Sequence, residues 1–110
     1  MKTPDKWIIL KINNTLYKIL ASWYGGYLGG DSWQMNSGII AVDNTKKAFN
    51  FHGSSGSCYH CYKNAYGMNS IAAGILNKLQ KVEGYEVIVM PEVTDWSAID
   101  YGITQNYTDD

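Results

Sequence analysis

Only one stretch of this chain spaces its apolar residues as an α-helix does, and this limits the fold classes open to it. Between residues 69 and 82, apolar side chains recur three or four positions apart: Ile71, Ala72, Ile75, Leu76, Leu79 and Val82. That spacing places them along one stripe of a helix. Asn69 or Ser70 can cap the start of the helix, and Gly84 can close it. We therefore expect helix to be confined mainly to residues 69–82.

Most of the other apolar segments alternate between apolar and polar positions, which is typical of strands with one buried face. The predicted strands are residues 7–12, 15–22, 38–42, 47–52, 57–62 and 85–90. Asn13 and Asn14 separate the first two strands, and asparagine tolerates the positive φ that a two-residue hairpin turn requires. Residues 24–37 are rich in glycine and are expected to form a loop. The pattern predicts an α+β fold, in which a mostly antiparallel sheet of five to six strands packs against one main helix.

The length and composition fit a single domain. The chain has 110 residues, of which 45% are hydrophobic and 17% charged, a globular rather than a disordered composition. Residues 94–103 carry enough apolar side chains that we expect them to pack on the domain, whereas about the last five residues should be loose. No apolar run approaches the roughly 20 residues needed to cross a bilayer, and no secretory signal is recognisable. We expect one domain over residues 1–110, in the cytoplasm and without a membrane partner.

Charge is distributed unevenly along the chain. Residues 1–82 contain all nine lysines and three acidic residues, a net charge of +6, whereas residues 83–110 contain seven acidic residues and no basic one. Two interpretations are open: the acidic segment lies against the basic remainder, or it forms an exposed strip that imitates nucleic acid or meets a basic partner. The chain contains no arginine, the residue whose planar fork grips phosphates and guanine edges, so specific nucleic-acid recognition is not expected.

The loop rich in glycine and aromatic residues is the predicted binding site. Its expected ligand- or partner-binding residues are Tyr24, Gly25, Gly26, Tyr27, Gly29, Gly30, Asp31 and Ser32. Glycine backbone can cradle an anion, and aromatic rings can stack on a planar group. The alternative is a compact loop held together by its own aromatics. We expect Trp23 and Trp33, at the ends of the loop, to be largely buried. Tyr24 and Tyr27 should be partly exposed.

Four side chains of metal-ligating type lie within ten residues: His52, Cys58, His60 and Cys61. Zinc binds such mixed sets, but residues 57–62 are a predicted strand, on which Cys58 and Cys61 point to opposite faces. A single C-x-x-C without a second pair is weak evidence for a metal site. We therefore predict structural roles for these residues, with no metal and no cofactor. A zinc site or a reactive thiol at this cluster is the alternative. No known catalytic motif occurs in the chain, so we assign no catalytic residue.

The chain also contains two longer runs of distinctive sequence, WYGGYLGGDSWQMNSGI (Trp23 to Ile39) and FHGSSGSCYHCYKNAYGM (Phe51 to Met68). They resemble segments of a family of small accessory proteins of large tailed bacteriophages. The matching positions are Gly25 to Ile39, Ser55 to Cys61 and Tyr66 to Met68. Cys61 falls on the cysteine of that pattern and Cys58 on a variable position, which also argues against a paired zinc site. The resemblance implies a non-structural phage protein made inside the infected cell, where such proteins often bind and disable a host factor.

The leading functional hypothesis is a non-catalytic binding module, a phage accessory or counter-defence protein. It would bind a host protein or sequester a small nucleotide-like ligand. One alternative is a small enzyme or zinc-binding protein that uses the cluster at residues 52–61. Another is an acidic nucleic-acid mimic that uses residues 83–110. The sequence leaves open the identity of the partner and whether the protein forms a homo-oligomer.

Overall fold

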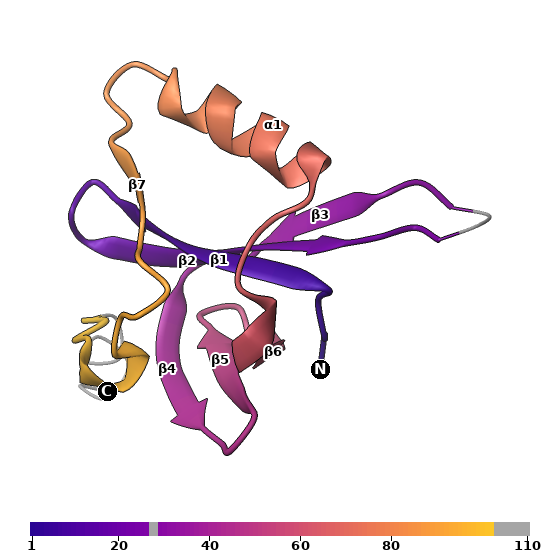
Figure 1. Ribbon diagram of the computed structural model, residues 1–110. Coiled ribbons are helices and arrows are strands. Elements are labelled where there is room, and N and C mark those ends of the chain that lie inside the picture. The colour runs from indigo at the N-terminus through magenta and orange to yellow at the C-terminus, as the bar shows by residue number, and fades with distance from the viewer. Residues whose placement is uncertain (27–28, 103–110) are drawn as a thin grey trace.

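The fold has three layers: a helix, a four-stranded sheet and a three-stranded sheet (Figure 1). The computed structural model describes residues 1–26 and 29–102. The four-stranded sheet has the order β3-β2-β1-β7 and consists of β1 (Lys6–Ile12), β2 (Leu16–Trp23), β3 (Ser32–Met35) and β7 (Val87–Val89). The three-stranded sheet consists of β4 (Ile39–Asn44), β5 (Ala48–Gly53) and β6 (Cys58–Tyr62), in that order. The remaining elements are helix α1 (Ser70–Gln80) and two short 3-10 helices, η1 (Lys63–Ala65) and η2 (Trp96–Ala98).

The named strands pair antiparallel in both sheets. The predicted α+β class, with one main helix on a mostly antiparallel sheet, is therefore confirmed, although the strands divide between two sheets. No helix in the described part of the chain is both long enough and apolar enough to span a membrane.

The opening hairpin shows how local sequence fixes the register of β1 and β2. Asn13 and Asn14 adopt φ values of 51° and 62°, the left-handed conformation that two-residue hairpin turns require. The Thr15 amide donates to the Ile12 carbonyl at 3.1 Å and closes the turn, but Ile12 pairs with Leu16, so the connection runs from Asn13 to Thr15 and is one residue longer than expected. The pairing continues to Lys6 opposite Ser22. The predicted hairpin is confirmed, although its two-residue connection is not.

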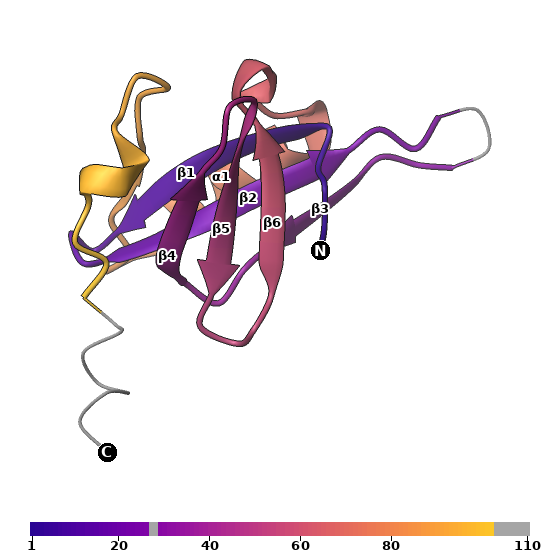
Figure 2. The ribbon, with the colours of Figure 1, turned by 90° about the horizontal axis from the view of Figure 1, so that it is seen from below.

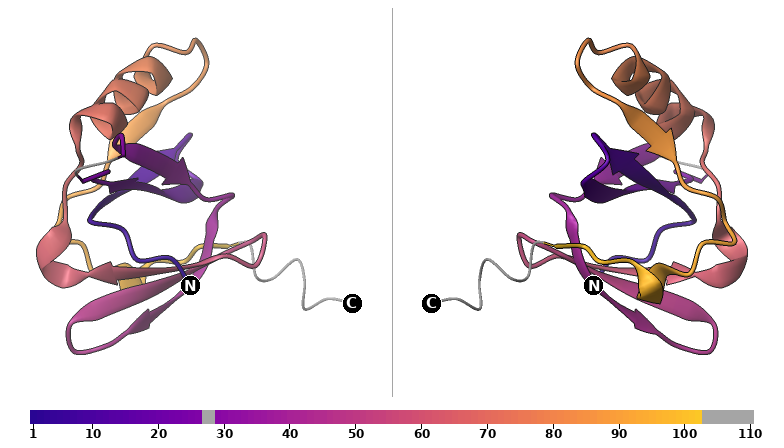
Figure 3. Two further views of the ribbon diagram at one scale, coloured as in Figure 1. Left: turned by 90° about the vertical axis from the view of Figure 1, so that its right-hand side faces the viewer. Right: turned by 90° about the vertical axis from the view of Figure 1, so that its left-hand side faces the viewer.

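Strand β1 is buried on both faces, which makes its sheet the middle layer. Trp7 and Ile9 belong to the core shared with the three-stranded sheet, whereas Ile8, Leu10 and Ile12 belong to the core under helix α1. Successive side chains of a strand point to opposite faces, so one alternating strand serves both cores. Figure 3 shows the helix and the three-stranded sheet on opposite sides of this middle layer.

Helix α1 is fixed to the sheet at its N-terminus. The Asn69 side chain accepts a hydrogen bond from the Ala72 amide at 2.9 Å and donates one to the Trp23 carbonyl at 3.1 Å. Asn69 is thus the predicted cap and also ties the helix to β2. At the other end the helix stops at Gln80, four residues before Gly84. Gly84, at φ 78°, lies in the following turn instead of closing the helix as expected.

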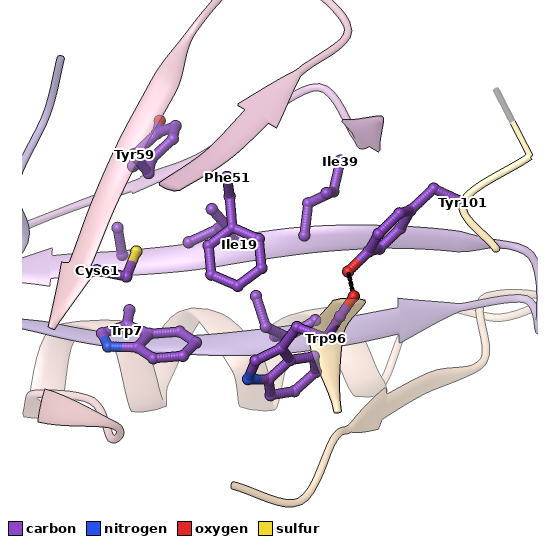
Figure 4. Packing of buried hydrophobic residues seen from close by; sticks show 10 residues of the cluster. Trp7, Ile19, Ile39, Phe51, Tyr59, Cys61, Trp96 and Tyr101 are labelled. Atoms are coloured by element: carbon purple, nitrogen blue, oxygen red, sulfur yellow. Dashed lines mark hydrogen bonds between the residues drawn. The ribbon is translucent and has the colours of Figure 1, made fainter. Parts of the chain in front are cut away.

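A second core fills the space between the two sheets (Figure 4). Trp7 packs against Phe51 with ring centroids 5.5 Å apart, and Trp96 stacks on Tyr66 at 6.1 Å. The Tyr101 hydroxyl donates to the Trp96 carbonyl at 2.7 Å. The expectation that the segment from residue 94 packs on the domain is confirmed through residue 102. Residues 103–110, which include the end expected to be loose, lie outside the described residues.

The N-terminal segment links the two sheets. The Lys2 amide donates to the Cys58 carbonyl at 2.9 Å, and the His60 amide donates to the Lys2 carbonyl at 2.7 Å. Lys2 thereby extends the three-stranded sheet beyond β6, and Figure 2 shows this segment beside β6. The same chain then enters β1 of the other sheet, so residues 2–5 occupy the corner where the two sheets meet.

Strand β3 is the main departure from the predicted secondary structure. Residues 24–37 were expected to form one loop, but Ser32–Met35 pairs with β2, from Trp23 opposite Ser32 to Leu20 opposite Met35. The glycines end at residue 30, so they restrict only the first half of the segment. Strand β7 is also shorter than predicted, because its pairing with β1 is limited to Val87–Val89.

Candidate ligand site beside the β2–β3 hairpin

The end of β2 and the beginning of β3 project beyond the rest of the sheet, at the right of Figure 1. We call this projecting hairpin the arm. Beyond the ends of these two strands, the chain segments at Gly25 and at Gly29–Gly30 approach too closely for a side chain on Gly25. A Cβ on Gly25 would lie 2.2 Å from the Gly30 carbonyl oxygen and 2.3 Å from that of Gly29. Because atoms cannot approach so closely, position 25 requires glycine. Gly25 of the predicted site thus has a structural role that its backbone geometry explains.

Two backbone amides at the start of this loop already donate hydrogen bonds to carboxylates. The Tyr24 amide donates to Asp5 Oδ2 at 2.8 Å, and the Gly25 amide donates to Asp31 Oδ1 at 3.0 Å. These two amides are therefore not free to bind an anion. The carboxylates of Asp5 and Asp31 also give this part of the arm a negative charge, which disfavours an anionic ligand there.

The aromatic side chains of the arm are more exposed than expected. Tyr24 is 53% exposed, as predicted, whereas Trp33 is 38% exposed. The expectation that Trp33 is largely buried is wrong, because β3 is an edge strand with a neighbour on one side only. Trp23 is half-buried, less than expected. Tyr27, also expected to be partly exposed, lies outside the described residues.

A hollow of about 390 Å³ lies between the arm and the N-terminal segment. It is lined by Lys2, Thr3, Trp23, Ser32, Trp33 and Gln34. The Trp23 indole nitrogen donates to the Thr3 carbonyl at 3.0 Å, so the ring is held against the N-terminal segment. Two segments that are distant in sequence therefore form this hollow. Trp23 shares a face of the hairpin with its partner Ser32, whereas Trp33 is paired with Ser22 on the opposite face, so the ring held against the hollow is that of Trp23.

The lining residues suit a small planar ligand. Indole rings stack on aromatic heterocycles. The hydroxyl groups of Thr3 and Ser32 and the amide of Gln34 can form hydrogen bonds to the edge of such a ring. Lys2 supplies one positive charge. None of the six lining residues is a cysteine, histidine, aspartate or glutamate, so the hollow offers binding groups and no pair of nucleophile and base.

Among the residues of the predicted site that the structure describes, Ser32 alone lines the hollow. Asp31 instead accepts a hydrogen bond from the Gly25 amide. Gly25 lies against the backbone of Gly29 and Gly30. The sequence did identify Trp23 and Trp33 as flanking rings, but gave them a buried role. Lys2 and Thr3 carried no sequence signal at all, because only the pairing of Lys2 with β6 brings them to the arm.

The histidine–cysteine cluster is divided between the two faces of the three-stranded sheet. Cys61 is buried in the core with Phe51 and Tyr59, whereas Cys58 is half-buried and outside that core. Burial raises the pKa of the Cys61 thiol, and the nearby Cys58 adds to this, so the thiol stays protonated and unreactive.

The two histidines each have a different partner. His52 Nε2 lies 2.8 Å from Asp43 Oδ2, and His60 Nδ1 lies 2.5 Å from Asn50 Oδ1. Within residues 1–26 and 29–102, no group of three or more histidine, cysteine or acidic side chains is arranged to hold a metal ion. The predicted placement of the two cysteines on opposite faces is confirmed.

The acidic C-terminal segment does not form ion pairs with the lysines in the described structure. Its described acidic residues are all exposed: Glu83, Glu86, Glu92, Asp95 and Asp100. In the part of the chain that the structure describes, the one ion pair joins His52 and Asp43. Asp95 and Asp100 instead accept hydrogen bonds from nearby backbone amides. The segment is held by its apolar side chains, Trp96 foremost, and its charges face solvent.

No protein-family model, curated protein or solved structure matches this chain.

Proposed function

We propose that this protein is a non-catalytic binding module that sequesters a small nucleotide-like ligand in the hollow lined by Trp23 and Trp33. The observation that carries the proposal is the make-up of that hollow: the Trp23 indole, held by Thr3, with neutral hydrogen-bonding groups and a single lysine around it. Its volume of about 390 Å³ falls in the lower part of the range for small-molecule sites.

The charges around the hollow restrict the ligand further. Lys2 can bind one negative group, whereas Asp5 and Asp31 at the adjoining arm repel further negative charge. A ligand with one phosphate charge or none therefore fits better than a nucleoside triphosphate. The heterocycle stacks on the Trp23 indole, and Ser32 and Gln34, on the same face of the hairpin, bind its polar edge.

The lining residues include no pair of nucleophile and base, which agrees with a sequestering role. The resemblance to phage accessory proteins agrees with it as well. Stacking and hydrogen bonding retain a ligand but do not change it chemically. On this proposal a phage-encoded protein of this kind acts in counter-defence, by withdrawing a signalling nucleotide from the host factor that responds to it.

The test is a binding titration with adenosine, cyclic AMP, AMP and ATP, followed by tryptophan fluorescence. We expect cyclic AMP or AMP to bind more tightly than ATP, and the recovered ligand to be chemically unchanged. Trp23→Ala should weaken binding by about 5- to 150-fold, since stacking on an aromatic side chain contributes about 1–3 kcal/mol per base.

Tyr24→Ala is the matched control, because Tyr24 is an exposed ring on the same arm that does not line the hollow. It should leave affinity unchanged. If no ligand of the panel binds, or if both variants weaken binding equally, the hollow is not the site. An equal effect would instead favour the arm as a docking surface for a host protein, for which the exposed Tyr24 and Trp33 are suited.

A further inference from the structure

Strand β3 forms one edge of the four-stranded sheet and pairs with β2 alone. The Asn36 amide donates to the Ile19 carbonyl at 3.3 Å, so the backbone groups of Asn36 point towards β2. These directions alternate along an antiparallel strand. The groups of Gln34 therefore also point to β2, whereas those of Trp33 and Met35 point outwards. Among the described residues, no hydrogen bond joins these outward amides and carbonyls to another group.

The other three sheet edges of the described structure are protected against the addition of a strand. Lys2 bonds to the backbone of β6 and covers that edge. Strand β4 shifts its register between Ile39 and Ala41 and carries Asp43. Strand β7 has three residues and is closely followed by Pro91. Covering segments, bulges, charges, prolines and short strands are the devices by which proteins block their sheet edges. The four residues of β3 include no charge, proline or register shift.

The backbone of this edge is complementary to a second copy of itself. When two β3 strands run antiparallel about a twofold axis at Gln34, Trp33 of each copy faces Met35 of the other. A hydrogen-bonded antiparallel pair exchanges two N–H···O=C bonds. The two pairs of Trp33 and Met35 therefore use all four outward backbone groups of each copy. The same residues meet on both sides, as a twofold interface requires.

The side chains of the edge match in the same register. Met35 packs on the core under helix α1, and Trp33 points to the same face with its side chain 38% exposed. Each indole would lie beside the methionine of the other copy, a favourable contact between sulfur and an aromatic ring. On the opposite face the two Gln34 amides meet at the axis and can hydrogen-bond to each other. Asp31 faces Ser37 of the second copy, so no like charges are opposed.

We propose that β3 is a dimerisation edge, to which β3 of a second copy adds antiparallel and so joins the two four-stranded sheets into one continuous sheet. The strand contributes only four residues from each copy, which places the contact among small, transient interfaces. The dimer should therefore form as the protein concentration rises and dissociate on dilution. The inference does not rest on the ligand proposed for the hollow, and each can fail without the other.

The first experiment is sedimentation velocity of the ligand-free protein over about a hundredfold range of concentration. The mean mass should rise from the monomer value of 12.3 kDa towards twice that value. Amide hydrogen exchange, read residue by residue by NMR at both ends of the range, locates the contact. The amides of Trp33 and Met35 should exchange at least fivefold more slowly at high concentration, because they gain partners. The amide of Val89, on the opposite edge of the same sheet, should stay within twofold.

Charge variants test the axis. Gln34→Lys and Gln34→Glu should each weaken dimerisation at least tenfold, because like charges directly opposite one another in a sheet repel. An equimolar mixture of the two should dimerise at least as well as the wild type, since opposite charges then meet. Gln34 is exposed, so both variants should keep the fold, which circular dichroism checks. Asn77→Lys and Asn77→Glu make the same changes at an exposed position of helix α1 and should stay within twofold of the wild type.

Four results would overturn the proposal. A monomeric mass at every concentration would leave the edge to a strand from a host protein. Dimerisation without slower exchange at Trp33 and Met35 would mean that the copies meet elsewhere. Equal losses in the Gln34→Lys and Asn77→Lys variants would show that association follows net charge alone. Failure of the mixture to dimerise would exclude the axis at Gln34.

Discussion

Cys61 illustrates how the core between the sheets affects an ionisable side chain. Its thiol is buried with Phe51 and Tyr59, and burial raises its pKa above the ordinary value of 9.0, with Cys58 adding to the shift. A group whose pKa is raised by folding stabilises the native state fully below its unfolded pKa. That contribution is lost as the pH rises towards the folded value.

We therefore predict an alkaline loss of stability that begins near pH 9 and depends on Cys61. Above that pH the slope for this group approaches about 1.4 kcal/mol per pH unit. Melting temperatures measured from pH 7 to pH 10 should fall more steeply above pH 9 for the wild type than for Cys61→Ala. Cys58→Ala, on the other face, should keep the wild-type slope. A chelator should change none of these curves; a chelator-induced drop would restore the zinc alternative.

Residue roles at the arm show what the sequence could and could not predict. The exposure of Tyr24 followed from its place beside a glycine pair. The exposure of Trp33 did not, because it depends on β3 being an edge strand. Lys2 and Thr3 reach the hollow through pairing with β6, more than fifty residues away in the chain, and no local pattern reports such a contact.

Among the elements, helix α1 is fixed at its N-terminus by one residue, Asn69, whose side chain makes two hydrogen bonds. Asn69 is buried, caps the Ala72 amide and donates to the Trp23 carbonyl. A cap that also bonds to the neighbouring sheet couples the formation of the helix to that of β2.

Asn69→Ala should accordingly destabilise the protein by about 2 kcal/mol, at the upper end of the range for lost N-caps. Asn77→Ala is the control, since Asn77 is exposed in the middle of the same helix and alanine is the better helix former there. Urea unfolding monitored by circular dichroism measures both. Equal stability of the two variants would show that the cap and its bond to β2 contribute little.

Element prediction worked where one local signal governed a segment. The helix spacing, the Asn13–Asn14 turn and the alternation of β1 each gave the observed element. Strand β3 was missed because glycines dominate the beginning of its segment, whereas its pairing with β2 decides the end. Strand β7 is shorter than predicted because its length depends on its pairing with β1, which is limited to Val87–Val89. Local sequence does not show the extent of that pairing.

At the scale of the whole molecule, the segment after β7 completes the core between the sheets. Trp96 contacts the rings of Trp7, Phe51 and Tyr66, with centroids about 6 Å apart, as expected for favourable aromatic pairs. The division into two sheets could not be predicted, because alternation shows which faces are buried but not which strands pair.

Trp96→Ala should cost about 3–5 kcal/mol, as truncation of a buried tryptophan typically does. That loss is a large part of the total stability of a domain of this size, about 5–15 kcal/mol. Val93→Ala, in the same segment but 92% exposed, should change stability by less than about 0.5 kcal/mol. Chemical denaturation of both variants checks this, and a mild effect of Trp96→Ala would mean that the segment only covers the surface.

The position of Trp7 has a consequence for how the chain folds during synthesis. This residue leaves the ribosome early, yet its ring is surrounded by Phe51, Tyr66 and Trp96. The hairpin of β1 and β2 can form as soon as it emerges, but one of its faces stays uncovered until residue 96 has been made. Contacts between residues so far apart in sequence slow folding, and an apolar face left open meanwhile favours association with other chains. We therefore expect this face of the hairpin to be open to association with other chains until Trp96 is in place.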